Sequence, residues 1–261
     1  MKNFFVIGDQ TSKSLSPLIF NYWFKKYKIN AKYGFLELNI KNFDKKIKEI
    51  LRKKDVGGLN ITIPFKQSII KHLDGLDQHS KKINAVNCVA INKKVNGVNT
   101  DWEGYYKTLP ALSNIKEKNI LVIGYGGAAL AIHYVLKLKG FQKITILNRT
   151  RKKLSFEKKT KYTLSAKTLN KYLPSADFII NTTPTNPINQ KNLSLVNKKT
   201  ILSDLVYIPK FTKFLKKFPG NKKIYGISML VNQAALSFKA WFGFSPSIDT
   251  RLLKILDKKI K

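Results

Sequence analysis

The chain has 261 residues, 43% of them hydrophobic, which is enough for a large core and predicts two domains. Its formal charge of +34 comes from 49 basic and 15 acidic residues, almost all of the basic ones lysine, and this shortage of arginine favours a solvated surface over a nucleic-acid interface. No apolar stretch reaches the about 18 residues of a membrane span, and the single cysteine, Cys88, excludes an internal disulfide and fits a cytoplasmic location.

Strand-like and helix-like segments alternate along the chain, which predicts an α/β fold with parallel sheets. A first strand is expected at Phe4–Gly8, and its apolar run ends too soon for a signal peptide. Ser16 and Pro17 suit the N-cap and the first position of a helix. The pattern then predicts a strand over 33–38, an amphipathic helix over 43–51 and a helix over 65–73.

The segment Asn60–Lys66 alternates polar with apolar residues. Asn60 and Thr62 would share one face of a strand, because successive strand side chains point to opposite faces. Pro64 cannot donate to a sheet ladder, so we expect the strand to end there. Lys66 would then lie at a strand end, where its amine can reach a cleft as an acid or a base.

After this segment the pattern predicts a strand pair over 86–91 and 94–98, and a connecting helix over 100–109. It starts afresh at Asn119 with an apolar strand, which we interpret as a second domain. Two helices separated by Ser245 and Pro246 end the chain. In the last helix, four apolar residues are expected to form one stripe: Ile248, Leu252, Leu253 and Leu256.

The second domain begins with the pattern G-x-G-x-x-G/A. An apolar strand over 120–123 leads into Gly124, Gly126 and Ala129, and a helix follows. Gly124 permits the tight turn, Gly126 lets a pyrophosphate approach the backbone, and Ala129 lets the helix pack on the sheet. The pyrophosphate would bind amides at the positive helix end. A tight turn without a ligand is the alternative.

The next strand, over 144–147, indicates which dinucleotide is bound. An NAD site usually places an acidic residue at the end of this strand for the ribose 2′-hydroxyl. Here the strand ends in Asn148, Arg149 and Thr150, followed by Arg151 and Lys152. Guanidinium and hydroxyl donors suit a 2′-phosphate, so NADP is the predicted cofactor.

Eight segments in order give the sequence a resemblance to the shikimate dehydrogenase family. They are Ser14–Pro17, Asn60–Lys66, Asn84–Asn87, Asn99–Asp101, Gly124–Ala129, Asn148–Thr150, Asp204–Tyr207 and Gly226–Gln233. The resemblance implies NADPH-dependent, reversible reduction of 3-dehydroshikimate to shikimate in aromatic amino-acid biosynthesis. It also implies an α/β substrate domain over 1–100, a Rossmann-like parallel-sheet NADP domain over 101–226, and C-terminal helices over 227–261 that return to the substrate domain.

The resemblance also implies site residues. Lys66 and Asp101 would form the acid–base pair, with Asp101 orienting the amine that serves the carbonyl oxygen. The substrate-binding residues would be Ser14, Ser16, Asn60, Thr62, Asn87, Tyr207 and Gln233, with Ser14, Ser16 and Tyr207 on the carboxylate. The cofactor-binding residues would be Gly124, Tyr125, Gly126, Gly127, Ala128, Asn148, Arg149, Thr150, Arg151, Lys152, Lys153, Leu205 and Gly226. Cys88, Val98, Tyr125 and Ser228 depart from the commonest family pattern.

Several alternatives stay open. Ser16 and Asp101 could simply cap helices, Tyr207 could lie at a core edge, and Lys66 could be one more solvated lysine. No metal site is expected, because the three histidines lack the spacing for one. The competing functions are a quinate/shikimate dehydrogenase with relaxed substrate and NAD(P) use, a methylenetetrahydrofolate dehydrogenase, a catalytically silent sensor, and a nucleic-acid-binding protein. The expected partners are the small-molecule substrate and, at most, a second copy in a homodimer.

Overall fold

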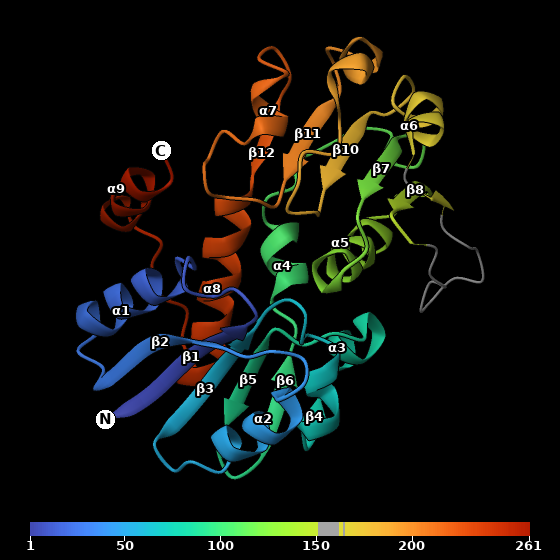
Figure 1. Ribbon diagram of the computed structural model, residues 1–261. Coiled ribbons are helices and arrows are strands. Elements are labelled where there is room, and N and C mark those ends of the chain that lie inside the picture. The colour runs from blue at the N-terminus through green and yellow to red at the C-terminus, as the bar shows by residue number, and fades with distance from the viewer. Residues whose placement is uncertain (151–161, 164) are drawn as a thin grey trace. The chain divides into compact units, whose positions relative to one another are not determined.

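The computed structural model describes residues 1–150, 162–163 and 165–261. The chain forms two compact units (Figure 1). Unit 1 comprises Met1–Gly104 and Leu230–Leu256. Unit 2 comprises Tyr105–Met229 and Asp257–Lys261.

Unit 1 is built on a six-stranded sheet with the order β2-β1-β3-β5-β6-β4. Its strands are β1 (Lys2–Gly8), β2 (Ala31–Glu37), β3 (Val56–Ile61), β4 (Gly75–Leu76), β5 (Cys88–Ile91) and β6 (Val95–Val98). Strands β2, β1 and β3 are parallel, whereas β5 is antiparallel to both β3 and β6. The expectation of parallel sheets thus holds in this unit for β2, β1 and β3 and for the β4–β6 pair, whereas β5 makes the sheet mixed. The three residues between β5 and β6 allow only a hairpin, since a parallel crossover needs a much longer connection.

The helices in the first half of the chain are α1 (Ser16–Lys26), α2 (Phe43–Leu51), the 3₁₀ helix η1 (Ser68–His72), α3 (Gln78–Ile83) and α4 (Asp101–Tyr106). Leu15, not Ser16, is the N-cap of α1, so the predicted capping role of Ser16 is wrong. The predicted helix over 65–73 shortens to η1. The first residues of the predicted helix form a turn instead, in which the Phe65 amide donates to the Thr62 carbonyl at 2.9 Å.

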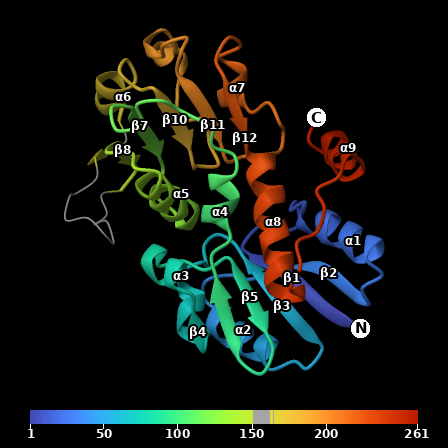
Figure 2. The same ribbon diagram turned by 180° about the vertical axis from the view of Figure 1, so that it is seen from behind.

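Helices cover both faces of the unit 1 sheet. On one face, Phe4 of β1 packs against Phe24 of α1 and Trp241 of α8 (Gly226–Phe242). On the other face, Ile7 and Leu59 pack with Ile47 of α2. Figure 2 shows this unit from behind. The last helix, α9 (Thr250–Lys259), buries Leu252 and Leu256 as predicted, but Ile248 and Leu253 are 38% and 42% exposed, so the predicted four-residue stripe is wrong at these two positions.

Unit 2 contains a six-stranded, wholly parallel sheet with the order β12-β11-β10-β7-β8-β9. Its strands are β7 (Asn119–Ile123), β8 (Lys143–Asn148), β9 (Tyr162–Thr163), β10 (Phe178–Asn181), β11 (Ile201–Asp204) and β12 (Lys223–Tyr225). This is the order of the doubly wound dinucleotide-binding fold, in which ligands bind at the carboxyl ends where the strand order reverses. The α/β fold with a Rossmann-like parallel sheet is therefore confirmed.

The helices of unit 2 include α5 (Gly127–Leu138), α6 (Ala166–Tyr172), η2 (Gln190–Leu195) and α7 (Lys213–Lys216). One face of the sheet presents Leu121, Ile179 and Leu202 to a core that contains Leu169 of α6 and Phe214 of α7. Because β7, β10 and β11 are in register, their last residues, Ile123, Asn181 and Asp204, lie side by side at one edge. Over the described residues, no helix combines the length and the apolar character that crossing a membrane would require.

Candidate active site

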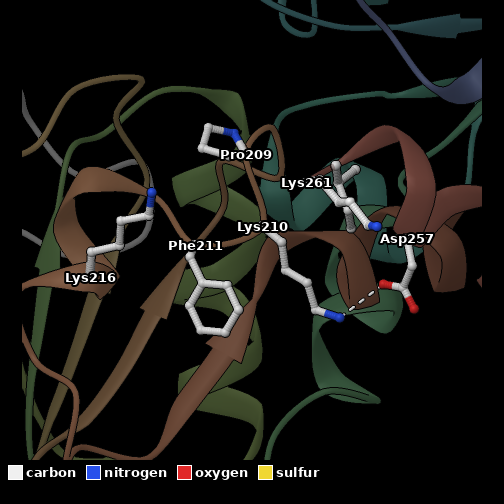
Figure 3. A pocket seen from close by; sticks show the side chains of 7 residues that line it. Pro209, Lys210, Phe211, Lys216, Asp257 and Lys261 are labelled. Atoms are coloured by element: carbon white, nitrogen blue, oxygen red, sulfur yellow. Dashed lines mark hydrogen bonds and ion pairs between the residues drawn. The ribbon is translucent and has the colours of Figure 1, made fainter.

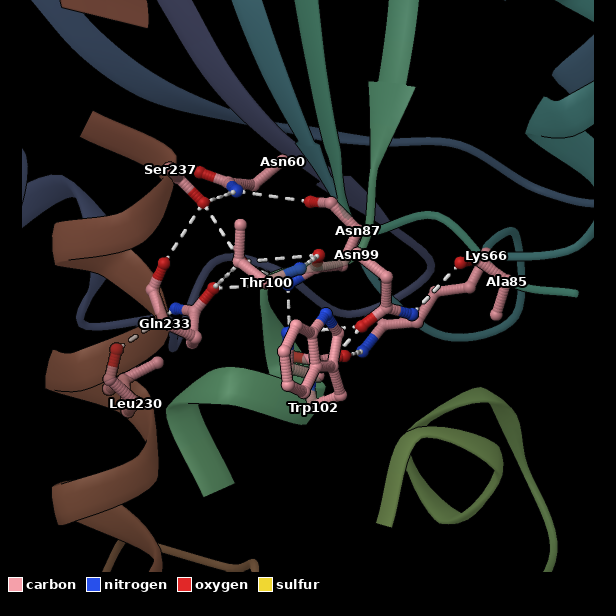
Figure 4. Close-up of polar contacts among 11 residues, drawn as sticks. Asn60, Lys66, Ala85, Asn87, Asn99, Thr100, Trp102, Leu230, Gln233 and Ser237 are labelled. Carbon is pink, nitrogen blue, oxygen red and sulfur yellow. Dashed lines mark hydrogen bonds and ion pairs between the residues drawn. The ribbon is translucent and has the colours of Figure 1, made fainter. Parts of the chain in front are cut away.

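The centre of the candidate site in unit 1 is an ion pair between Lys66 and Asp101. The Lys66 Nζ atom lies 2.6 Å from Asp101 Oδ2, and the two side chains are 10% and 6% exposed. Lys66 follows β3 and the turn at Pro64, whereas Asp101 is the first residue of α4. These two residues, 35 positions apart in the chain, therefore meet at one end of the sheet (Figure 4). A buried ammonium beside a carboxylate can hold or release a proton at a defined place.

Asn87 links this ion pair to helix α8. Its Nδ2 atom lies 2.9 Å from Asp101 Oδ1 and 3.2 Å from Gln233 Oε1, and it also reaches the Thr100 hydroxyl at 2.9 Å. Its Oδ1 atom accepts from the Thr100 amide at 2.6 Å. Lys66, Asp101, Asn87 and Gln233 thus belong to one hydrogen-bonded network. Figure 4 labels Lys66, Asn87 and Gln233 within it.

Asn60 lies behind this network rather than at its edge. Its Oδ1 atom accepts from the Tyr33 hydroxyl at 2.7 Å, and its Nδ2 atom donates to the Asn87 carbonyl at 3.0 Å and to Ser237 Oγ at 2.9 Å. Ser237 also contacts Thr100, with 3.1 Å between the two hydroxyl oxygens. Hydrogen bonds to Tyr33, Asn87 and Ser237 thus fix both polar atoms of the Asn60 side chain, which suits a supporting role for a residue that we predicted to bind substrate.

Sequence reasoning quoted Thr100 within a motif but gave it no role, and it missed Ser237. Ser237 lies one helical turn after Gln233, so its spacing could have placed it on the same face of α8. Cys88 lies in the same region, and burial raises the pKa of its thiol to about 12. This cysteine is therefore a packing residue and not a nucleophile.

The other predicted substrate residues are divided between the two units. In unit 1, Ser14 Oγ accepts from the Ser16 amide at 3.2 Å, Ser16 is buried, and Thr62 is half-buried just after β3. Tyr207, half-buried, lies in unit 2 in the loop after β11. The structure thus brings Asn60, Asn87 and Gln233 together with Lys66 and Asp101, and it places the two serines together in the loop before α1.

The glycine turn of unit 2 has the geometry that a pyrophosphate site needs. Gly124 adopts φ +100°, and a Cβ atom there would lie 2.4 Å from Thr182 Oγ1, so only glycine fits. At Gly126 a Cβ atom would meet no protein atom within 4 Å, which leaves open space above the backbone. Gly126 is the N-cap of α5, which is 12 residues long and has no side-chain cap. Gly127 and Ala128 open this helix, and Tyr125 is buried.

The end of β8 carries the residues predicted to select the cofactor. The Asn148 side chain donates to the Thr150 carbonyl at 2.7 Å, which fixes the turn that follows the strand. Arg149 and Thr150 are exposed there. The remaining predicted residues of this segment, Arg151, Lys152 and Lys153, lie outside the described residues.

Leu205 and Gly226 meet at the end of β11. A Cβ atom on Gly226 would lie 2.4 Å from the Leu205 carbonyl oxygen, so this glycine allows the loop after β11 to pack against the start of α8. The residues present fit a dinucleotide: a positive-φ glycine, an open backbone at a helix N-terminus, and exposed cation and hydroxyl donors after β8.

A separate pocket of about 290 Å³ in unit 2 contains none of the predicted site residues (Figure 3). It is lined by Pro209, Lys210, Phe211, Lys216, Asp257, Ile260 and Lys261. Lys210 Nζ lies 2.9 Å from Asp257 Oδ1 across its wall. None of the polar side chains that line this pocket is buried.

Comparisons with known proteins agree along the whole chain. The model of the shikimate dehydrogenase substrate binding domain matches residues 6–89, that of the shikimate / quinate 5-dehydrogenase matches residues 108–208, and that of the shikimate 5′-dehydrogenase C-terminal domain matches residues 226–250. The shikimate dehydrogenase (NADP(+)) of Staphylococcus haemolyticus strain JCSC1435 is 35% identical, over 97% of each chain. That of Staphylococcus aureus strain MSSA476 is 36% identical, over 98% of each chain.

Solved structures give the same result. The shikimate 5-dehydrogenase of Thermus thermophilus, in complex with NADP(H) and shikimate, is similar with a TM-score of 0.80 and 26% identity, over 100% of both chains. A chorismate mutase/shikimate 5-dehydrogenase fusion protein of Clostridium acetobutylicum is similar with a TM-score of 0.84 and 29% identity, over 100% of this chain and 98% of that one.

Proposed function

Because this chain belongs to the shikimate dehydrogenase family, we propose that it is an NADP-dependent oxidoreductase that interconverts 3-dehydroshikimate and shikimate. The observation that supports this reaction most directly is the buried ion pair between Lys66 and Asp101, joined to Asn87 and Gln233. A ketone reduction needs one proton at the developing alkoxide, and this pair provides a proton donor held in place.

Several residues of unit 2 would hold NADP. The Gly124–Ala128 turn and the start of α5 would take the pyrophosphate, Arg149 and Thr150 the 2′-phosphate, and Leu205 and Gly226 the nicotinamide side. When bound, this group supplies the hydride. We propose that unit 2 binds the cofactor and that unit 1 provides most of the substrate contacts, with the sequence boundaries near residues 100 and 226.

Lys66 would supply the proton. Its Nζ atom carries three hydrogens as an ammonium, and Asp101 accepts one of them, which leaves donors for a carbonyl oxygen. Asp101 is itself held by Asn87, so the direction of the ammonium is fixed from two sides. A positioned acid–base group of this kind contributes about 10²–10⁴-fold to the rate.

The polar groups around the ion pair would bind the substrate. Gln233 and Asn87 would contact ring oxygens together with Thr62, whereas Ser14, Ser16 and Tyr207 would contact the carboxylate. Asn60 would act through Asn87, whose backbone carbonyl it holds. We also propose that the molecule works in the cytoplasm, as a monomer or homodimer, without a specific nucleic-acid partner.

The direct test is to mix the purified protein with shikimate and NADP and to follow the absorbance of reduced nicotinamide. Parallel reactions replace shikimate with quinate, and NADP with NAD, because one matching family model covers quinate dehydrogenases too. We expect turnover with shikimate and NADP well above the other combinations. Absence of turnover with every pair would overturn the proposal, and equal use of quinate or NAD would establish the relaxed alternative.

A further inference from the structure

The carboxyl ends of β10 and β11 carry a buried polar pair that the reaction does not use. Asn181 and Asp204 are the last residues of these strands, are paired in register, and are each 1% exposed. The Asn181 Nδ2 atom lies 3.1 Å from Asp204 Oδ1. Neither residue is among the predicted site residues, although Asp204 opens one of the segments that resemble the family.

Asn181 holds the loop that follows β10. Its Nδ2 atom also donates to the carbonyls of Thr183 and Thr185, at 3.2 and 3.0 Å. Its Oδ1 atom accepts from the amide and the hydroxyl of Thr183, at 3.0 and 2.8 Å. This is the loop whose Thr182 side chain packs against Gly124, so its position determines the space beside the glycine turn.

Asp204 holds the loop that follows β11. Its Oδ1 atom accepts from the Val206 amide at 3.1 Å, and its Oδ2 atom accepts from the Thr212 hydroxyl at 2.6 Å. Thr212 in turn caps α7, because its Oγ1 atom accepts from the Leu215 amide at 3.2 Å. The loop between these two anchor points, residues 205–212, carries the predicted ligand contacts Leu205 and Tyr207.

Within the described part of the chain, Asp204 binds these donors without a cation. The ion pairs found among the described residues do not include it, although the chain has 49 lysines and arginines. Burial raises the pKa of its carboxyl, and the hydrogen bonds from Thr212, Val206 and Asn181 oppose this shift. Burial of an acid is unfavourable unless hydrogen bonds replace its hydration. Here the donors that replace it come from the end of β10, from the loop after β11 and from the cap of α7.

We propose that Asn181 and Asp204 are positioning residues that hold the loops 182–185 and 205–212 in the arrangement that binds NADP(H). Neither side chain needs to touch the cofactor. Loss of one anchor lets the loops leave the competent arrangement, and the apparent dissociation constant rises by the inverse of the competent fraction. The inference rests on the proposed function, because it concerns the cofactor of that reaction.

The test uses a matched pair of isosteric substitutions in the full chain. Thr212→Val removes the hydroxyl that donates to Asp204. Thr200→Val is the control, because Thr200 is also buried and its hydroxyl donates to the Ala176 carbonyl at 2.7 Å, just before the amino end of β11. Thr200→Val removes one buried hydrogen bond, whereas Thr212→Val removes the bond to Asp204 and also the cap of α7. Both changes lie beside the same strand, but only Thr212 lies at the end where the cofactor is expected, and Asp204→Asn, described below, leaves the α7 cap in place.

Binding of NADPH is measured by titrating its fluorescence without substrate, alongside the melting temperature. We expect both valine variants to melt at lower temperature. Only Thr212→Val should raise the dissociation constant for NADPH, and the rise is about tenfold if the loops adopt the binding arrangement in about a tenth of the molecules. Thr212→Ser should restore binding, and kcat at saturating NADP should stay within about twofold, since occupied sites hold ordered loops.

Asp204→Asn provides a second, independent variant, with the same expected rise in the dissociation constant. Unchanged NADPH binding in both Thr212→Val and Asp204→Asn, or an equal loss of binding in Thr200→Val, would overturn the inference. A wild-type protein that binds no NADPH would instead overturn the proposed function, so the two failures are distinguishable.

Discussion

Replacement of Lys66 by alanine tests both the chemistry and the burial of the ion pair. The chain offers a close control, because Lys71 also pairs with an aspartate, Asp44, at the same 2.6 Å distance. The difference is exposure: the Lys71 and Lys66 side chains are 60% and 10% exposed. Removal of one partner of a buried pair costs about 3–5 kcal/mol of unfolding free energy, whereas an exposed pair contributes about 0–1 kcal/mol.

We expect Lys66→Ala to lie near the lower end of this range, about 3 kcal/mol, because Asp101 keeps its hydrogen bond from Asn87. Lys71→Ala should stay within about 1 kcal/mol of the wild type, since Asp44 also contacts His72. Chemical denaturation gives both values. In the NADP-reduction assay with shikimate, kcat should fall at least about 100-fold in Lys66→Ala and remain unchanged in Lys71→Ala.

Two results would refute this reasoning in different ways. Turnover of Lys66→Ala within a few-fold of the wild type would remove Lys66 from the proton transfer. Equal loss of stability in Lys66→Ala and Lys71→Ala would show that burial does not govern the strength of the ion pair. A fall in kcat without the difference in stability would support the chemical role but not the electrostatic argument.

Three further predictions concern the cofactor turn and the surface. Gly124→Ala should lower the melting temperature because φ is +100° and the Cβ atom would clash with Thr182, whereas Gly126→Ala should keep the melting temperature and weaken NADPH binding in a fluorescence titration. Arg149→Ala should raise the KM for NADP at least about tenfold and leave the KM for NAD nearly unchanged, and equal effects on both would contradict a 2′-phosphate contact. The Lys26, Tyr22 and Leu252 contacts lower the pKa of Asp249 to about 2, so the stabilisation that Asp249→Asn removes at pH 7 should vanish as the pH falls from about 4 to 2. Denaturation curves at several pH values check this, and a constant difference between variant and wild type would contradict it.

The sequence predicted those features that depend on local pattern. The strand, glycine turn and helix around Gly124 follow from residues that are adjacent in the chain, and the structure confirms this element order. The end of β3 before Pro64 likewise follows from the missing amide of proline. The hairpin of β5 and β6 was predicted as a strand pair, but the direction of β5 in the sheet was not considered.

Features that depend on the strand order were not predicted. Asn181 and Asp204 face each other only because β10 and β11 are neighbours, and their 23-residue separation carries no signal of this contact. Ser237 and Asn60 are 177 residues apart, and they meet because α8 packs on the unit 1 sheet. The meeting of Lys66 with Asp101 was expected only from the family resemblance, since neither residue type nor spacing singles out this pair.

The number of lysines shows why burial, and not residue type, separates a catalytic candidate from the surface. With 49 basic residues, an aspartate near the surface can meet an ammonium by chance, as Asp44, Asp249 and Asp257 do. Among the lysines of the described residues, Lys66 alone is buried. An ammonium leaves water only where a carboxylate and fixed hydrogen bonds replace its hydration, and Asp101 with Asn87 provides this arrangement. Such an arrangement is costly to maintain for stability alone, so its presence at the end of β3 favours a chemical role for this one lysine over the remaining ones.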